Sequence, residues 1–392
     1  MEKLKVIISG GGTGGHIFPA LSIAGEIRAR MPGADILFVG ALGKMEMERV
    51  PAEGFKIIGL PVMGMPRKIS PEMFRFLWKL YQSMRKARKV IHDFQPDVAV
   101  GVGGFASGPV LKAAVRKGVP AVLQEQNSYA GVTNKLLSAK VRKICVAYSG
   151  MERYFPAEKI ILTGNPVRRS LLNPVDPKLA FTEFGLTEGK PVVLIVGGSL
   201  GARTLNESVL ANRELIRKST IQVIWQTGRI YYREMMERLK DNHPESLKPV
   251  EFLSNMDLAY ASADLVISRA GAGTISELCL LGKPSVLVPS PNVAEDHQTK
   301  NAMALVEKEA AVLVKDVDAK KRLISEAFDL VRDQERLARL SGNALKLAMP
   351  GATAKIVDVI LGELGEKAAG KPEKGNRKTE VAGSKSTKPH TL

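Results

Sequence analysis

Residues 4–20 read LKVIISGGGTGGHIFPA, in which a short apolar run, a glycine-rich turn and the start of a helical pattern follow one another directly. Residues 192–203 read VVLIVGGSLGAR and repeat this arrangement in the second half of the chain. A strand, a glycine turn and a helix in this order are typical of the first unit of a doubly wound parallel sheet. The two segments therefore predict an α/β protein with two doubly wound sheets, one in each half.

Short apolar runs alternate with helical patterns around both segments, as expected for parallel strands that are linked by helices. In the first half we expect strands at Leu4–Ser9, Asp35–Val39, Asp97–Val102 and Ala121–Gln124, and helices at Pro19–Met31 and Pro109–Lys117. In the second half we expect strands at Val192–Val196, Ile221–Gln226, Leu265–Ser268 and Ser285–Pro289, and helices from about Ala202 and at Thr274–Leu281. Ligands of such sheets bind beyond the carboxyl ends of the strands, so two facing units would form a cleft.

The chain has 392 residues, which is more than one hydrophobic core usually supports. Pro166, Pro174 and Pro177 mark a linker, so we expect domains at residues 1–170 and 171–350. After Gly365 the sequence is rich in Lys, Gly, Ser and Thr and nearly lacks large apolar residues. Such a composition cannot offset the entropy of ordering, so residues 366–392 are predicted to form a disordered basic tail. A solvated tail is favoured over a tail that binds an anion.

The net charge of +17 points to an anionic partner, which could be nucleic acid, nucleotide phosphate or a membrane surface. No apolar run approaches the roughly 18 residues of a membrane-spanning helix, and the first residues do not resemble a signal peptide. We therefore expect a cytoplasmic protein. Cys145 and Cys279 lie in apolar segments and are interpreted as buried hydrophobic residues, and no Cys/His cluster has the spacing of a zinc site.

The first glycine turn contains a formal G-x-G-x-x-G match at Gly10, Gly12 and Gly15. A dinucleotide site would also need an acidic residue at the end of the second strand, where the sequence reads FVGA at residues 38–41. This argues against NAD or FAD. The turn is instead expected to approach a substrate closely, and the alternative is a tight turn that needs small residues only for packing.

His16 follows this turn at the point where the strand leads into a helix. An imidazole there can accept a proton from a hydroxyl group near neutral pH, which makes His16 a candidate general base. The alternative, a helix N-terminal residue that bonds to its own loop, is equally compatible with the sequence.

In the second half, the turn at 197–203 offers backbone amides and the Ser199 hydroxyl, and residues 268–277 read SRAGAGTISE. The helix start at Thr274 can stabilise a diphosphate, and Glu277 can accept hydrogen bonds from ribose hydroxyls. Compensation of the helix dipole is the alternative role for Glu277. Gln298 has an amide that can read sugar hydroxyls. Residues 316–318, DVD, resemble a metal-binding acidic pair, but their place before a helical stretch favours capping.

Residues 63–94 combine large apolar side chains with cations. Between Arg67 and Lys89 there are eight Lys or Arg residues and one acid, Glu72. This pattern predicts a patch that docks on an anionic membrane surface. The alternative is a core-facing helix with a solvated basic face. The patch is assigned to Met73, Phe74, Arg75, Phe76, Leu77, Trp78 and Lys79.

Six ordered motifs together resemble one family. They are Gly11–Pro19 (GGTGGHIFP), Gly103–Pro109 (GGFASGP), Glu125–Asn127 (EQN), Gly164–Arg168 (GNPVR), Gly197–Arg203 (GGSLGAR) and Asp296–Gln298 (DHQ). The family is that of the undecaprenyldiphospho-muramoylpentapeptide β-N-acetylglucosaminyltransferases of peptidoglycan synthesis. The resemblance runs from about Lys5 to Leu364.

The resemblance implies the GT-B fold, in which two doubly wound, Rossmann-like domains face a cleft. It implies that the second domain holds UDP-GlcNAc, that the first holds the undecaprenyl-linked acceptor, and that no cofactor or bound metal is required. It implies a helix at 351–365 that crosses back to the first domain, and peripheral attachment to the cytoplasmic side of the inner membrane. The donor contacts that it implies are Thr13, Gly14, Gly15, Asn127, Arg168, Ser199, Leu253, Ala272, Gly273, Thr274, Glu277 and Gln298.

Two positions depart from the family pattern. Where many members have His before the Glu-Gln-Asn motif, this chain has Gln124, and where they have Tyr after the paired glycines it has Phe105. Gln124 cannot carry a proton and Phe105 has no hydroxyl, so the search for a catalytic base turns to His16, with Glu125 as its alternative or partner. The predicted reaction is an inverting transfer of GlcNAc to the MurNAc 4-hydroxyl, which converts lipid I to lipid II.

Two other classes of protein remain open. A nucleic-acid-binding protein would explain the charge, but the chain lacks the usual RNA- or DNA-binding motifs, so no nucleic acid is expected as a partner. A UDP-GlcNAc epimerase, or another GT-B transferase with a lipid acceptor, would share the fold. An epimerase would need no lipid acceptor and no basic aromatic patch.

Overall fold

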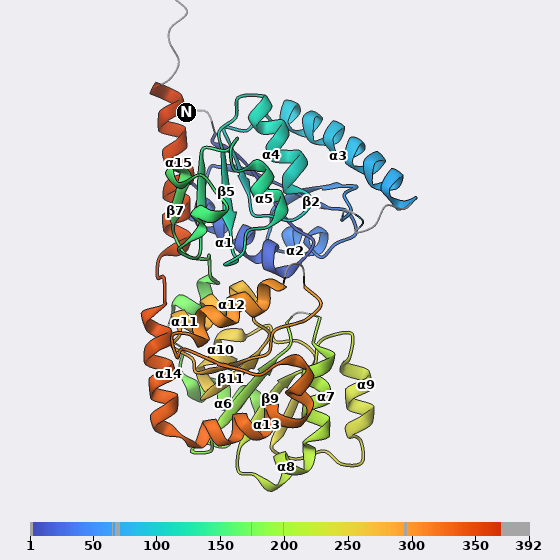
Figure 1. Cartoon of the computed structure of the whole chain (residues 1–392), viewed down its shortest axis with the longest axis vertical. Coiled ribbons are helices and arrows are strands. Elements are labelled where there is room, and N and C mark those ends of the chain that lie inside the picture. The colour runs from blue at the N-terminus through green and yellow to red at the C-terminus, as the bar shows by residue number, and fades with distance from the viewer. Residues whose placement is uncertain are drawn as a thin grey trace, which may run out of the picture.

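The computed structural model describes residues 3–64, 66, 71–173, 175–198, 200–293 and 296–369. The chain forms two halves that are stacked along the long axis of the molecule, each built on a sheet with helices around it (Figure 1). All strand pairs in both sheets are parallel. The prediction of two doubly wound sheets is therefore confirmed.

The first sheet has seven strands in the order β3-β2-β1-β4-β5-β6-β7. Its strands are β1 (Lys5–Ser9), β2 (Asp35–Ala41), β3 (Lys56–Leu60), β4 (Val98–Gly101), β5 (Ala121–Glu125), β6 (Lys143–Val146) and β7 (Ile160–Leu162). The helices of this half are α1 (Gly14–Arg30), α2 (Glu46–Ala52), α3 (Glu72–Phe94), α4 (Ser107–Arg116) and α5 (Val132–Leu137), with short 3-10 turns at Met151–Arg153, Ala157–Lys159 and Arg169–Leu172. The strand order reverses beside β1, so the first glycine turn lies at the position where such sheets bind ligands.

The second sheet has six strands in the order β10-β9-β8-β11-β12-β13. Its strands are β8 (Val192–Val196), β9 (Gln222–Gln226), β10 (Leu247–Val250), β11 (Leu265–Ser268), β12 (Ser285–Leu287) and β13 (Val312–Leu313). The helices that follow the linker are α6 (Pro177–Phe184), α7 (Arg203–Ala211), α8 (Arg213–Lys218), α9 (Tyr232–Leu239), α10 (Met256–Ser262), α11 (Ala272–Leu280), α12 (His297–Val306), α13 (Asp316–Arg332), α14 (Gln334–Lys346) and α15 (Ala352–Ala369). Here the order reverses beside β8, again next to a glycine turn.

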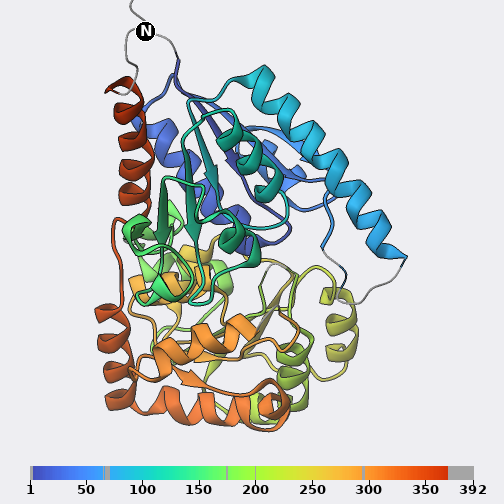
Figure 2. The same ribbon diagram turned by 45° about the horizontal axis from the view of Figure 1, so that its top comes forward.

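The last helix of the described residues, α15, packs on the first half, against α1 and β4 (Figures 1 and 2). Its Ile356, Val357 and Ile360 are fully buried in the same cluster as residues of β1 and α1, and Arg30 of α1 pairs with Asp358. Helix α15 therefore ties the two halves together.

Because α15 continues to Ala369, the first four residues of the expected tail are helical, and residues 370–392 lie outside the described part.

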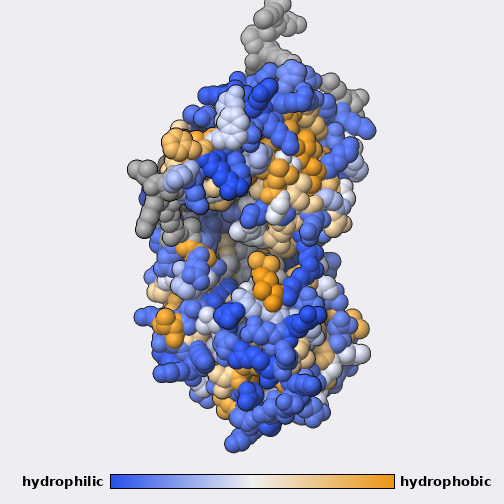
Figure 3. Space-filling model, turned by 90° about the vertical axis from the view of Figure 1, so that its right-hand side faces the viewer, coloured by the Kyte–Doolittle hydropathy of each residue, from blue (hydrophilic) through white to orange (hydrophobic). Residues whose placement is uncertain are grey.

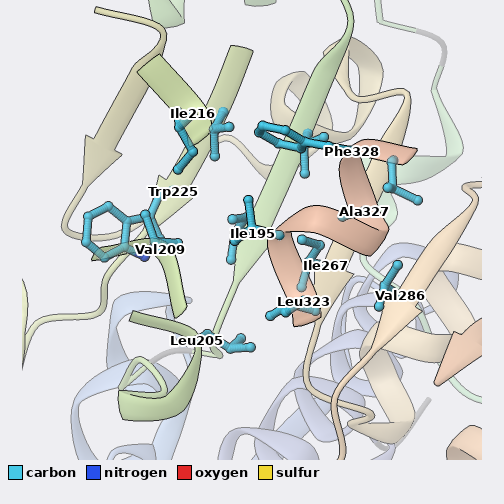
Figure 4. Packing of buried hydrophobic residues seen from close by; sticks show 14 of the residues in the cluster. Ile195, Leu205, Val209, Ile216, Trp225, Ile267, Val286, Leu323, Ala327 and Phe328 are labelled. Carbon is cyan, nitrogen blue, oxygen red and sulfur yellow. The ribbon is translucent and has the colours of Figure 1, made fainter. Parts of the chain in front are cut away.

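Alternate residues of the central strands fill the core on opposite faces of each sheet, as a period of two requires. In β8, Val193 and Ile195 join one buried cluster, whereas Val192 and Leu194 join the other. Figure 4 shows the first of these clusters, which contains Ile195, Trp225 and Phe328 of α13, with the Trp225 ring beside Val209. The strands are buried on both faces, which explains why the sequence shows continuous apolar runs and not an alternating pattern.

One helix boundary differs from the sequence prediction in a way that affects function. The expected helix at Pro19–Met31 begins at Gly14 in the structure, so His16 lies inside its first turn. Pro19 is in the interior of α1, where it removes one backbone donor without ending the helix. The prediction was wrong because it treated this proline as the start of the helix.

Candidate active site

The loops that follow the strand ends of the two sheets meet between the halves, where a hollow is visible in the space-filling view (Figure 3). Two buried asparagines join the halves. Asn165 Nδ2 donates to Ser276 Oγ at 3.0 Å. Asn301 of α12 accepts hydrogen bonds from the backbone and the hydroxyl of Ser128, and donates to Asn127 Oδ1 at 3.1 Å. Helices α1 and α11 also contact each other across the boundary.

The first glycine turn is held by a buried carboxylate. Gly11 and Gly12 have φ angles of 145° and 90°, which side chains rarely tolerate. The backbone N–H groups of Gly12 and Ala41 both donate to Glu46 Oε1 at 2.9 Å, and Glu46 is fully buried. The sequence analysis missed this acid, because it looked for one at the end of β2 and Glu46 comes from α2.

His16 lies directly after this turn with its ring partly covered. Its Nδ1 is 3.1 Å from Thr13 Oγ1, the ring is hydrogen-bonded to the backbone of Gly11, and a Cβ on Gly103 would lie 2.9 Å from its Cδ2. Burial lowers the pKa of His16 to about 4, and the nearby His297 acts in the same direction. The imidazole is therefore uncharged at neutral pH and has a lone pair available for a proton.

Glu125 ends β5 and is 2% exposed. Its Oε1 accepts hydrogen bonds from the backbone and side chain of Asn127, and its Oε2 accepts them from the Gly131 backbone and from Asn134, both at 2.9 Å. Burial raises the pKa of Glu125, although these four donors oppose the shift. The carboxyl group thus organises the loop that follows β5.

The two departures from the family pattern occupy different surroundings. Gln124 is fully buried and bonds to Gln126 and to Asn165, so its amide is part of the network that links the halves. Phe105 is 55% exposed, and a Cβ on Gly64 would lie 3.0 Å from its Cζ. Its ring therefore lies against Gly64, just after β3.

Arg168 and Glu277 form an ion pair between the linker and α11, with Arg168 Nε 3.0 Å from Glu277 Oε1. The Tyr260 hydroxyl donates to Glu277 Oε2 at 3.1 Å, and the Arg168 guanidinium lies 5.5 Å from the centre of the Phe18 ring. Burial raises the pKa of Glu277, and the charge of Arg168 opposes that shift. The pair brings two predicted donor-binding residues into direct contact.

The N-terminus of α11 carries three further predicted donor contacts, Ala272, Gly273 and Thr274. The residue before them is Gly271, which has no side chain to cap the first turn. The N–H groups at a helix start attract anions, and the helix dipole adds to this. The turn is therefore chemically suited to a phosphate group.

The remaining predicted contacts are placed less favourably for direct binding. The Gln298 side-chain oxygen already accepts a hydrogen bond from the Ser290 backbone at 2.8 Å. Leu253 is 4% exposed and belongs to the core of the second half, which leaves its backbone for any contact with a ligand. Ser199 lies outside the described residues.

The acidic pair at residues 316–318 begins with Asp316, which pairs with Arg269 and accepts a hydrogen bond from Thr204.

The first three turns of α3 carry large apolar side chains on the surface. Phe74 is 79% exposed and Trp78 is 60% exposed, and the Trp78 ring stacks on Tyr81 with centroids 5.8 Å apart. Leu77 is also exposed, whereas Met73, Phe76 and Lys79 are half-buried. The helix is buried only from Ser83 onward, and its start projects away from the body (Figure 2). This arrangement excludes a core-facing role for these turns. Nothing among the described helices is long and apolar enough to span a membrane.

Both halves of the chain match domains of one glycosyltransferase family. Residues 6–146 match the glycosyltransferase family 28 N-terminal domain, and residues 192–356 match the glycosyltransferase family 28 C-terminal domain. A Parabacteroides distasonis protein named UDP-N-acetylglucosamine–N-acetylmuramyl-(pentapeptide) pyrophosphoryl-undecaprenol N-acetylglucosamine transferase is 57% identical over 364 residues, which cover 92% of this chain and 98% of that protein. A Cytophaga hutchinsonii protein of the same name is 53% identical over 92% of this chain and 96% of its own length.

Solved structures agree at the level of the fold. The crystal structure of Acinetobacter baumannii MurG matches with a TM-score of 0.71 and 27% identity, over 92% of this chain and 99% of that one. A Neisseria meningitidis UDP-GlcNAc 2-epimerase bound to UDP-GlcNAc matches with a TM-score of 0.65 and 15% identity, over 92% of this chain and 100% of that one, which shows a shared fold alone. The chain is thus a glycosyltransferase with the predicted GT-B fold, and it belongs to the family of UDP-N-acetylglucosamine–N-acetylmuramyl-(pentapeptide) pyrophosphoryl-undecaprenol N-acetylglucosamine transferases.

Proposed function

We propose that this enzyme transfers N-acetylglucosamine from UDP-GlcNAc to the 4-hydroxyl of the muramyl sugar in undecaprenyl-diphospho-MurNAc-pentapeptide, with inversion at the anomeric carbon. The observation that carries the proposal is the identity of 53–57% over nine-tenths of the chain to proteins named for this transfer. The product is the last membrane-anchored intermediate of peptidoglycan synthesis before export.

In this proposal the donor diphosphate binds at the start of α11. The uncapped N–H groups of Ala272, Gly273 and Thr274 and the guanidinium of Arg168 supply positive potential where negative charge develops as UDP leaves. Glu277 is within one turn of these groups and is held by Tyr260, which suits a carboxylate that accepts hydrogen bonds from ribose. Donor binding would then replace or share the Arg168–Glu277 contact.

His16 is the proposed general base. The oxygen of the acceptor hydroxyl bonds to the anomeric carbon, the bond from that carbon to the UDP oxygen breaks with its electron pair, and the hydroxyl proton passes to His16. The neutral imidazole that the lowered pKa maintains is the form that can accept this proton. A bound diphosphate is negatively charged and would raise the pKa of His16 toward the working pH.

The arrangement favours His16 over Glu125 for this role. Both oxygens of Glu125 already accept hydrogen bonds from its own loop, and the side chain is buried. Thr13, Gly14 and Gly15 lie in the first turn of α1 or directly before it, together with His16. Asn127 is oriented by Glu125 and by Asn301 of the second half, so groups from both halves fix its amide.

The exposed start of α3 is proposed to dock on the cytoplasmic face of the membrane that holds the lipid acceptor. Phe74, Leu77 and Trp78 would enter the interface, while Arg75 and Lys79 would contact anionic head groups.

The test is a transfer assay with the full chain, labelled UDP-GlcNAc and a detergent-solubilised lipid-linked MurNAc-pentapeptide. The expected result is release of UDP that depends on the acceptor, with the label recovered in the lipid as a β-linked sugar. Conversion of UDP-GlcNAc to its 2-epimer, or release of UDP at the same rate without acceptor, would contradict the proposal and favour an epimerase. Salt-sensitive binding to RNA is expected to be weak and independent of sequence.

A further inference from the structure

The fully buried carboxylate of Glu46 is not used by the proposed reaction, and its surroundings are unusual. Its Oε1 accepts hydrogen bonds from the backbone of Gly12 and Ala41. Its Oε2 is buried and meets no hydrogen-bond partner among the described residues. A buried carboxyl oxygen without a partner costs stability, so packing alone does not explain an acid at this position.

Two glycines make room for this side chain. A Cβ on Gly11 would lie 2.0 Å from Glu46 Oε1, and a Cβ on Gly40 would lie 2.6 Å from Glu46 Cγ. The acid, which α2 supplies, therefore fills a slot between the end of β2 and the first glycine turn. The positive φ angles of Gly11 and Gly12 are compatible with the same explanation, since the turn folds around the carboxylate.

The N–H of Gly12 and the carbonyl of Gly11 belong to one planar peptide group. Glu46 accepts from the N–H end of this group at 2.9 Å. The other end faces His16, whose ring is hydrogen-bonded to the Gly11 backbone. An acceptor at the N–H end fixes the plane of the peptide and strengthens the carbonyl as an acceptor, because hydrogen bonds in a chain polarise one another.

We propose that Glu46 is a positioning residue for His16, acting through the peptide group that joins Gly11 to Gly12. Glu46 accepts from the N–H end of this peptide group, the carbonyl end accepts from the His16 ring, and the pair fixes which ring nitrogen carries the proton. The Thr13 hydroxyl, 3.1 Å from Nδ1, also contacts the ring, and the acceptor hydroxyl approaches the nitrogen that holds the lone pair. In other enzymes that use a histidine base, a directly bonded carboxylate fixes the tautomer and the orientation of the imidazole. Here Glu46 has this effect through one peptide group. The inference rests on the proposed role of His16 as the base.

The test uses two changes of different character in the full-length enzyme. Glu46→Gln keeps a side-chain oxygen that can accept from both N–H groups, and Glu46→Leu fills the slot without any acceptor. We expect Glu46→Leu to lower kcat by roughly 10- to 100-fold, with KM for UDP-GlcNAc little changed. This is the range found when a residue that only orients a functional side chain is replaced. Glu46→Gln should restore most of kcat. Glu48→Leu, an exposed position in the same helix, is the matched control.

A double-mutant cycle separates this role from a purely structural one. In a His16→Ala background, Glu46→Leu should cause almost no further loss of kcat, because the group that it positions is already absent. Equal losses in both backgrounds would overturn the inference and leave the base assignment intact. Full activity of His16→Ala by itself would instead remove the proposed base, so the two failures can be told apart.

A second readout does not depend on the leucine variant being folded. The ¹⁵N chemical shifts of the His16 ring report which nitrogen carries the proton, and they can be compared in the wild-type enzyme and in Glu46→Gln. A single dominant tautomer in the wild type and a less unequal mixture in the variant are the expected result. Identical ring shifts in the two proteins would overturn the inference.

Discussion

The first glycine turn follows β1 and the start of α11 follows β11, so the two are strand–turn–helix units at neighbouring positions of their sheets, yet they are built for different chemistry. In the first half, Glu46 accepts two backbone donors near the turn and a neutral imidazole lies at the helix start. In the second half, the donors of Ala272, Gly273 and Thr274 remain uncapped by a side chain. Neither helix start has a side-chain cap, so the difference lies in the residues at the turn: α1 carries the imidazole of His16 there, whereas α11 offers only its backbone amides and the Thr274 hydroxyl.

The largest expected effect comes from replacing His16 in the first half. His16→Ala should lower kcat by about 10²–10⁴-fold, because it removes the group that accepts the hydroxyl proton. Steady-state kinetics of transfer to the lipid-linked acceptor measure the loss. His92→Ala, whose side chain is 69% exposed on α3, is the control and should behave as the wild type. Wild-type turnover in a stable His16→Ala enzyme would refute the assignment.

A second expected effect concerns the surface that distinguishes the first half from the second. Replacing both Phe74 and Trp78 with Ser should weaken binding to anionic liposomes by roughly 10³-fold, since burial of each side chain contributes about 2 kcal/mol. Sedimentation with vesicles of anionic lipid measures this. Val317→Ser removes an apolar side chain that is 85% exposed on α13 and should have no effect. Unchanged vesicle binding in the double variant would contradict the docking proposal.

The smallest expected effect is on stability at low pH. Because burial lowers the pKa of His16 from 6.5 to about 4, the unfolded chain binds this proton more readily than the folded one. This contribution is fully present above about pH 6.5 and is lost as the pH falls toward 4. Glu125 and Glu277 act in the opposite sense, since burial raises their pKa.

The pH effect can be isolated by comparing variants. Melting temperatures at pH 7 and pH 4.5 should differ less in His16→Ala than in the wild type, because the variant has no imidazole to protonate on unfolding. His92→Ala should show the wild-type difference. An equal difference in all three proteins would mean that the His16 ring is not shielded from the solvent in the folded state.

Much of the fold follows from the sequence because the central strands are buried on both faces. Continuous runs such as Val192–Val196 are visible without any structure, and the glycine turns mark where each sheet begins. The short edge strand β13 has two residues and was not predicted, since a run of that length carries little signal. The start of α1 was misplaced because Pro19 sits inside the helix.

The site was predictable only where a residue lies on a motif. His16 and Thr274 follow glycine turns and were identified from that position, although their roles remain proposals. Glu46 was missed, because its partner Gly12 is 34 residues away in sequence and only the packing of α2 brings them together. Leu253 was named from the resemblance alone, and its burial could not be read from the local sequence.

We assign UDP to Arg168 and the second half, and the acceptor to His16. The affinity for UDP in two variants tests this assignment most directly. Calorimetric titration of UDP should give a Kd for His16→Ala close to that of the wild type, because the imidazole serves the acceptor. Arg168→Ala should raise the Kd by roughly 10-fold or more, the loss expected for one charge-assisted hydrogen bond. A loss of UDP affinity in His16→Ala as large as that in Arg168→Ala would contradict the account, since it would place both residues on the donor.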